Sequence, residues 1–151
     1  MFDRILSFFS AGHGYRTPLP AADAQHVLGA LLVRAAQADK AYLFQEVERI
    51  DRILARRFDL NPLEAAKMRA QCERLNDEMP DTEELLTKLH DAIDVSEREA
   101  SLRALWQVVF ADGQEHETED AFLTLAQQTL GVDPETCARI REAVLQDLKT
   151  D

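Results

Sequence analysis

The chain is short of basic charge and of long apolar runs, and each shortage excludes a class of protein. Of its 151 residues, 17 are Lys or Arg and 28 are Asp or Glu, which gives a net charge of −11. Nucleic acids are bound through Lys and Arg patches, so we expect no nucleic-acid partner. No apolar run approaches the roughly 18–20 residues that span a bilayer, and a secretory signal is not evident. We therefore expect a cytoplasmic protein without a transmembrane segment.

Cysteines and catalytic motifs are also scarce. The two cysteines, Cys72 and Cys137, stand on apolar helical stripes far apart in the sequence, and we interpret them as reduced core thiols. The sequence has no Gly-rich phosphate loop and no Glu-x-x-His pattern. The pair His90-Asp91 resembles part of a metal-dependent phosphohydrolase site, but no helical spacing joins it to the remaining histidines. We therefore predict that the chain is not an enzyme; a deep cleft with strongly perturbed titratable groups would argue otherwise.

Apolar residues recur with the period of an α-helix along almost the whole chain, and no window alternates long enough to predict a strand. A loop is expected at 11–20, with helices at about 21–38, 44–58, 62–78, 82–93, 97–111, 118–130 and 134–148. The first and fifth helices are apolar nearly all round, which predicts that both are central and buried.

Capping residues and apolar stripes define the remaining expectations for these helices. Ser96 with Glu99 predicts a capping box at the start of the fifth helix. Asn61 and Asp133 each precede a proline, which predicts N-caps followed by Pro at the first helical position. Asp81 is expected to cap 82–93. The apolar stripe of 44–58 is expected to be Phe44, Val47, Ile50, Leu54 and Phe58.

One pattern occurs twice. Ala38-Asp39 corresponds to Ala111-Asp112, Glu46 corresponds to Glu119, and Leu60-Asn61-Pro62 corresponds to Val132-Asp133-Pro134. A doubled helix–acidic turn–helix unit predicts an all-α fold: a single compact domain of about seven or eight helices with an internal pseudo-two-fold repeat, over 21–151. Residues 1–20 would form a short N-terminal helix and loop. We expect this helix to close the core, the alternative being shallow contact with a membrane surface, for which its polar face lacks Lys and Arg.

The two turns hold the candidate site residues. In the second turn, Asp112 and Glu119 can converge on one ion, and oxygen ligands suit Ca²⁺ or Mg²⁺. His116 would add a nitrogen ligand for Zn²⁺. The first turn offers Asp39 and Glu46 but carries Lys40 where the second has Gly113, so it is the poorer half. The alternative is structural: acids collect at helix N-termini because the helix dipole favours them, and these carboxylates would then only cap helices.

At these repeated turns the sequence resembles the TerB-like family, which includes the tellurite resistance proteins TerB. The strongest stretch runs from Leu105 to Gly113, through Glu119-Asp120, to Leu130-Gly131-Val132. The resemblance implies a compact helical fold of two related halves, each with an Ala-Asp-Gly turn and a downstream glutamate, and a link to divalent cations. The matching positions are Asp39, Glu46, Asp112 and Glu119.

The leading hypothesis is therefore a non-enzymatic cytosolic helical module that binds a divalent cation, a protein partner or both through the acidic turns. Its principal ligands would be Asp112 and Glu119, with Asp39 and Glu46 contributing. The competing hypothesis is a purely structural protein–protein interaction domain without a metal site. Family membership does not by itself imply tellurite resistance, because one fold hosts many functions.

Overall fold

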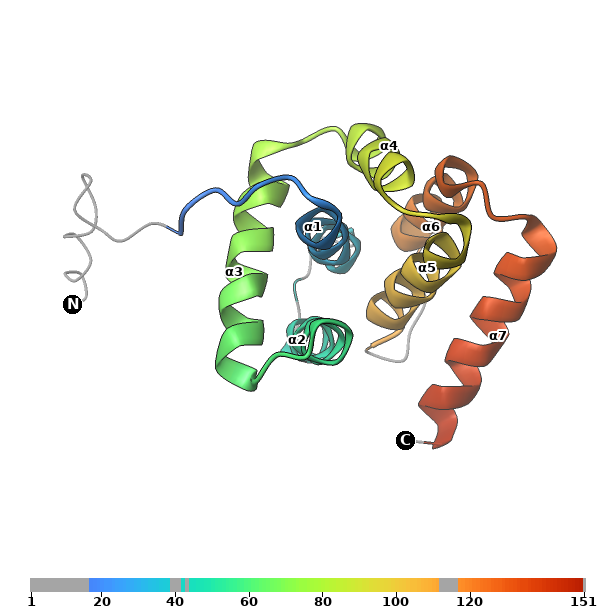
Figure 1. Cartoon of the computed structure of the whole chain (residues 1–151). Coiled ribbons are helices and arrows are strands. Elements are labelled where there is room, and N and C mark those ends of the chain that lie inside the picture. Colours follow the sequence, from blue (N-terminus) through green and yellow to red (C-terminus); the bar gives the residue numbers. More distant parts are fainter. Residues whose placement is uncertain (1–16, 39–41, 43, 112–116, 151) are drawn as a thin grey trace.

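The computed structural model describes residues 17–38, 42, 44–111 and 117–150, and the side chains of all of these except 117–120 and 148–150. Within these residues every regular element is a helix, as the periodicity predicted (Figure 1). The helices are α1 (Ala24–Ala36), α2 (Phe44–Phe58), α3 (Pro62–Glu78), α4 (Thr82–Ala92), α5 (Val95–Val109), α6 (Glu117–Leu130) and α7 (Pro134–Thr150).

The two most apolar helices, α1 and α5, form the centre of the molecule. They contact each other, and α1 also packs against α2, α3 and α4, whereas α5 packs against α2, α6 and α7. Figure 1 accordingly shows α1 with α2, α3 and α4 around it on one side and α5 with α6 and α7 on the other. Nine of the 13 residues of α1 are buried. The expectation of two buried central helices is confirmed for α1 and for α5 from Ser101 onward, whereas the start of α5 at Val95–Glu97 is exposed.

Aromatic and cationic side chains join α7 to α5. The rings of Trp106 and Phe110 stack with their centroids 5.1 Å apart. The Arg141 guanidinium of α7 lies over both rings, 5.8 Å from the Trp106 centroid and 5.9 Å from that of Phe110. A guanidinium over an aromatic face is attracted by the ring quadrupole, so this contact holds the last helix against the core.

Most of the predicted caps are present. The Asn61 side chain accepts from the Glu64 backbone N–H (2.8 Å), and the Glu64 carboxylate accepts from the Asn61 N–H (2.9 Å), which completes a capping box at α3. Asp81 caps α4, accepting from the N–H of Glu83 (3.0 Å). Asp133 accepts from the Thr136 N–H (3.1 Å) at the start of α7. These bonds from helix-start N–H groups to capping side chains explain why the helix starts could be located from the sequence.

The predicted start of α5 was wrong. The helix begins at Val95, and its N-cap is Asp94, whose carboxylate accepts from the Glu97 N–H at 3.0 Å. Ser96 lies inside the first turn, where its hydroxyl donates to Asp94 at 2.9 Å instead of capping. Asp94 stands three residues before Glu97, which is the capping-box spacing that Ser96 and Glu99 also have. Asp94 additionally supplies a charged acceptor. The bonds from Glu97 and Ser96 lower the pKa of Asp94 below its ordinary value.

The buried stripe of α2 is also rotated from the predicted one. Phe44 was expected to face inward but is 75% exposed. The buried residues are Glu46, Ile50, Ile53 and Leu54, while Val47 and Phe58 are half-buried. A carboxylate therefore occupies a position that the helical period assigns to the core.

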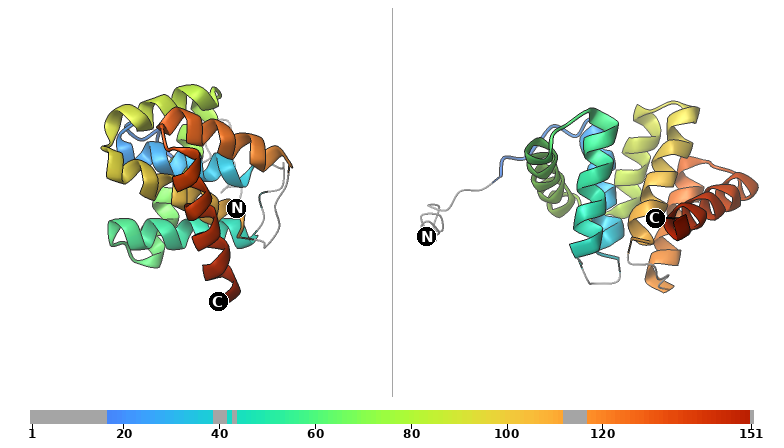
Figure 2. Two further views of the ribbon diagram at one scale, coloured as in Figure 1. Left: turned by 90° about the vertical axis from the view of Figure 1, so that its right-hand side faces the viewer. Right: turned by 90° about the horizontal axis from the view of Figure 1, so that it is seen from below.

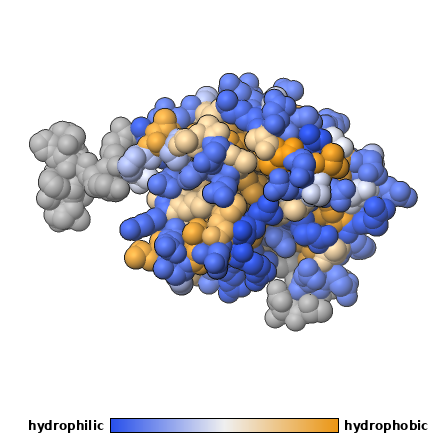
Figure 3. Space-filling view, in the orientation of Figure 1, coloured by the Kyte–Doolittle hydropathy of each residue, from blue (hydrophilic) through white to orange (hydrophobic). Residues whose placement is uncertain are grey.

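Figure 3 shows the outer surface in the orientation of Figure 1, where hydrophilic residues predominate and apolar residues appear between them.

One arginine ties α1 to the corner between α3 and α4. The Arg34 guanidinium donates to the Asn76 side chain (Nε to Oδ1, 2.7 Å), to the Asn76 carbonyl (2.7 Å) and to the Met79 carbonyl. It also donates to the Pro80 carbonyl and the Thr82 hydroxyl, both at 3.3 Å. The last carbonyls of a helix have no intrahelical donor, so Arg34 satisfies the end of α3 from a neighbouring helix.

Candidate acidic site at one end of the bundle

The helix ends that flank the two acidic turns lie at the same end of the molecule. Before the first turn, α1 ends at Ala36, with the Gln37 N–H bonded to the Val33 carbonyl at 3.0 Å, and α2 begins at Phe44. Before the second turn, α5 ends at Val109, and α6 begins at Glu117. Both views of Figure 2 place the last turns of α1 and α5 and the first turns of α2 and α6 at one end of the bundle.

The structure does not describe the side chains of most of the predicted ligands. Asp39, Asp112 and His116 lie outside the described residues, and Glu119 belongs to the first turn of α6, where only the backbone is described. Their roles as ligands therefore stay predictions. Within the described residues, no group of three or more His, Cys, Asp or Glu side chains is arranged to hold a metal ion.

Glu46 is the predicted ligand that the structure does describe. It lies in the first turn of α2, where the helix dipole favours a negative charge. The side chain is fully buried, with 0% exposure, and it has an interaction partner within the chain. A carboxylate withdrawn from water needs charge or hydrogen-bond compensation, because its isolated burial is very costly. Glu46 therefore reaches into the interior from the first acidic turn and is not displayed to solvent.

A polar network beside the first turn holds α2 against α3. The Tyr42 hydroxyl donates to Glu73 at 2.8 Å, and Arg69 donates to Glu73 at 3.0 Å and to Asp51 at 2.6 Å. Burial raises the pKa of Tyr42, and the hydrogen bond to Glu73 and its charge raise it further. Burial alone would lower the pKa of Arg69, but the bonds to Asp51 and Glu73 outweigh it and the pKa is raised. The network fixes the entry into α2.

Sequence reasoning missed this network, although part of it had a signal. Arg69 and Glu73 are four residues apart on a predicted helix, a spacing at which opposite charges meet. Their link to Asp51 and Tyr42 depends on how α2 packs against α3, so it could not be read from spacing.

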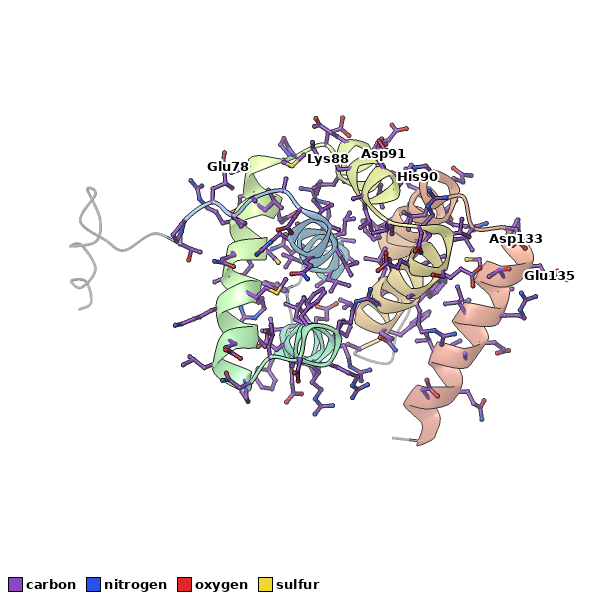
Figure 4. All side chains as sticks on the ribbon, in the orientation of Figure 1. Glu78, Lys88, His90, Asp91, Asp133 and Glu135 are labelled. Carbon is purple, nitrogen blue, oxygen red and sulfur yellow. The ribbon has the colours of Figure 1, made fainter. Side chains whose placement is uncertain are left out.

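A second acidic region covers α4, whose start is bonded to Arg34 near the end of α1. A shallow hollow there is lined by Asp81, Glu83, Glu84, Thr87, Lys88 and Asp91. Figure 4 shows Lys88, His90 and Asp91 together at the outer edge of α4. His90 Nδ1 lies 3.0 Å from Asp91 Oδ1. His26, the other described histidine, lies on α1 and bonds to Asp23 and Gln71, so it adds no ligand to this pair.

The cysteines behave as the sequence predicted. Both are free and buried. Burial raises the pKa of the Cys72 thiol to about 12, with Asp23 and Glu73 adding to the effect. Burial also raises the pKa of Cys137. A thiol that stays protonated is a poor nucleophile and a poor metal ligand, so neither residue adds reactivity to the site.

Seven described helices, five of them packed around the central α1 and α5, define an all-helical module. The chain belongs to the tellurite resistance protein TerB family, whose family model matches residues 25–142. The resemblance seen at the repeated turns is thereby confirmed. Comparisons with the curated proteins and with the solved structures find no significant match. Among the helices described, none has the length and apolar character to cross a membrane.

Proposed function

We propose that this TerB-family chain is a non-enzymatic cytoplasmic module that binds a divalent cation, a protein partner or both at the end of the bundle where the two acidic turns begin. Asp112 and Glu119 would be the principal ligands, with Asp39 and Glu46 contributing. Oxygen ligands alone favour Ca²⁺ or Mg²⁺, and participation of His116 would favour Zn²⁺. We further propose a response to tellurite as the physiological setting, a proposal that the family relationship supports.

The burial of Glu46 is the observation that carries the proposal. The Glu46 carboxyl group is at 0% exposure in a chain of net charge −11, and it has an interaction partner within the chain. Buried charges in proteins are paired or coordinate metal ions. A divalent cation at this end of the bundle would stabilise Glu46 together with the carboxylates of both turns. The exposed side chain of Phe44, two residues before Glu46, offers an apolar contact for a protein partner on the same end.

The test is a titration of chelator-treated protein with Ca²⁺, Mg²⁺ and Zn²⁺, followed by amide NMR shifts. We expect saturable shifts at residues 44–48 and 112–121 with at least one of these ions. Glu46→Gln keeps the shape of the side chain but removes its charge, and Asp112→Asn with Glu119→Gln removes two more ligands. Each should weaken the binding by tenfold or more.

A matched control neutralises two acids elsewhere. Glu83→Gln with Glu84→Gln removes the same number of charges from the exposed α4 region. If binding depended only on net charge, the control would weaken it as much as the double change in the second turn. Absence of shifts at 44–48 and 112–121 up to millimolar cation would end the cation part of the proposal.

A specific observation also favours the structural alternative. At the starts of five helices, a side-chain oxygen accepts a hydrogen bond from a backbone N–H group. The accepting residues are Asp23, Asn61, Asp81, Asp94 and Asp133. Polar residues at helix starts in this fold therefore often act as caps. If the acids of the second turn are only caps, Asp112→Ala with Glu119→Ala should lower the free energy of unfolding by about 1–2 kcal/mol, with the same loss in chelator and in cation. A loss seen only in cation would reject that alternative.

A further inference from the structure

Five arginines converge on one hollow of this strongly acidic chain. A cavity of about 410 Å³ lies where α2, α5 and α7 meet, with α5 between the other two helices (Figures 1 and 2). Its arginines, here called the arginine cluster, are Arg49, Arg52, Arg56 and Arg57 of α2 and Arg103 of α5. They are five of the 17 Lys and Arg residues, and Asp147 of α7 is the one carboxylate of the lining.

The geometry of the two helices explains how the hollow forms. Positions 49, 52, 53 and 56 lie on one face of α2, and positions 100, 103, 104 and 107 lie on one face of α5. On α5 two of these positions are alanines, whose small side chains leave space between the helices. Ile53 and Ala104 are buried at 8% and 3% exposure and provide an apolar floor. The guanidinium groups of both helices therefore surround a space with an apolar base.

The cluster differs from the other arginines in its partners. Elsewhere in the described chain, five arginines donate to carboxylates, amides, hydroxyls or carbonyls: Arg34, Arg69, Arg74, Arg98 and Arg139. Arg141 lies over the Trp106 and Phe110 rings. Within the cluster, Arg52 forms a long, exposed ion pair with Glu48 (3.9 Å). The other four make no hydrogen bond or ion pair with any residue that the structure describes. The hollow thus holds several guanidinium groups whose donors are available to a ligand.

Helix electrostatics account for only part of this arrangement. Arg56 and Arg57 lie in the last turn of α2, where the dipole favours cations. Arg49, Arg52 and Arg103 lie inside their helices, away from that effect. Arg52 and Arg56 are four residues apart, a spacing at which like charges destabilise a helix. An anion bound between them would relieve this repulsion.

We propose that the arginine cluster is a binding site for a phosphate-bearing small molecule with at least two negative charges. Guanidinium groups bind phosphate oxygens bidentately. The five positive charges of the cluster also exceed the one negative charge that the lining carboxylate, Asp147, can supply. The cavity volume falls in the range of about 300–1,000 Å³ typical of small-ligand sites. The apolar floor would contact the uncharged part of the ligand. This site is separate from the acidic turns and does not depend on the cation proposal.

The test measures binding of inorganic pyrophosphate and of ATP by calorimetry in excess chelator, so that no divalent cation takes part. Both should bind in the micromolar range with an affinity that falls as salt rises. Equal affinities would support recognition of the phosphate groups alone, and tighter ATP binding would support a nucleotide ligand. Binding no tighter than that of sulfate or chloride would overturn the proposal.

Two variants with opposite expected effects locate the site. Arg49→Gln with Arg103→Gln removes one guanidinium from each helix and should weaken pyrophosphate binding at least tenfold. Asp147→Asn removes the carboxylate of the lining and should strengthen it several-fold. Arg139→Gln changes an exposed arginine of α7 outside the cavity and should leave the affinity unchanged. If Arg139→Gln weakened binding as much as the double variant, or if Asp147→Asn weakened it, the cavity would not be the site.

Discussion

Replacing Arg34 with alanine should lower the free energy of unfolding by about 3 kcal/mol, as measured by urea denaturation. The guanidinium supplies five hydrogen bonds to the end of α3 and the start of α4. Bonds that involve a charged group contribute about 1.5–3 kcal/mol each, and an acceptor left unsatisfied carries a further cost. Because the five bonds share one side chain, their contributions are not additive, and the expected loss is less than their sum.

Two further variants test whether the planar, forked shape of the Arg34 guanidinium is required. Arg34→Lys keeps the charge but cannot reach several acceptors from fixed directions, so it should lose an intermediate amount. Arg139→Ala removes an exposed arginine with a weak pair to Glu135 (3.8 Å) and should change stability by about 0.5 kcal/mol or less. A loss below about 1 kcal/mol for Arg34→Ala, or equal stability of the Lys variant and the parent protein, would contradict the assigned role.

The second large effect is expected at Gly29 of α1, which packs against Cys72 of α3. A Cβ atom added at Gly29 would lie 2.1 Å from the Cys72 sulfur, so a side chain there forces the helices apart. Gly29→Val should lower the free energy of unfolding by about 3 kcal/mol, since overpacking a filled core typically costs 1–3 kcal/mol or more. Valine is a better helix former than glycine, and that gain offsets only part of the loss.

A double-mutant cycle with Cys72→Ala separates packing from backbone effects. Removing the sulfur should recover at least about 1 kcal/mol of the Gly29→Val loss, because contacting residues couple whereas distant ones add independently. Gly131 is the control: it has a φ of +74° and nothing within 4 Å of an added Cβ. Gly131→Ala should destabilise through backbone strain alone and show no coupling to Cys72. Additive effects of Gly29→Val and Cys72→Ala would contradict the close contact.

The sequence predicted the fold well where local chemistry decides it. The bounds of α3 could be placed because Asn61 and Pro62 define its start, and α1 and α5 could be placed at the centre because they are apolar all round. The start of α5 could not be chosen, since Asp94 and Ser96 are both good N-caps at suitable spacing. Phe44 was misplaced because an apolar residue at the first position of a helix can lie beyond the covered face.

The candidate site was less predictable, for two physical reasons. A hydrophobic pattern treats Glu46 as polar and therefore exposed, yet it occupies a core position of α2. The arginines of α2 stand outside its predicted apolar stripe, and their convergence with Arg103 depends on packing between helices that are far apart in the sequence. The predicted ligand roles that stay untested are those of Asp39, Asp112, His116 and Glu119, because the structure does not describe these side chains.

The most direct test of the cation proposal is paramagnetic line broadening by Mn²⁺, an oxygen-preferring ion that broadens nearby amide signals. Substoichiometric Mn²⁺ added to chelator-treated protein should broaden residues 44–48 of α2 and 117–121 of α6 together, while residues 95–98, at the opposite end of α5 from the second turn, stay sharp. Broadening centred on the acids of α4, or broadening of one turn without the other, would contradict a cation held jointly by the two acidic turns.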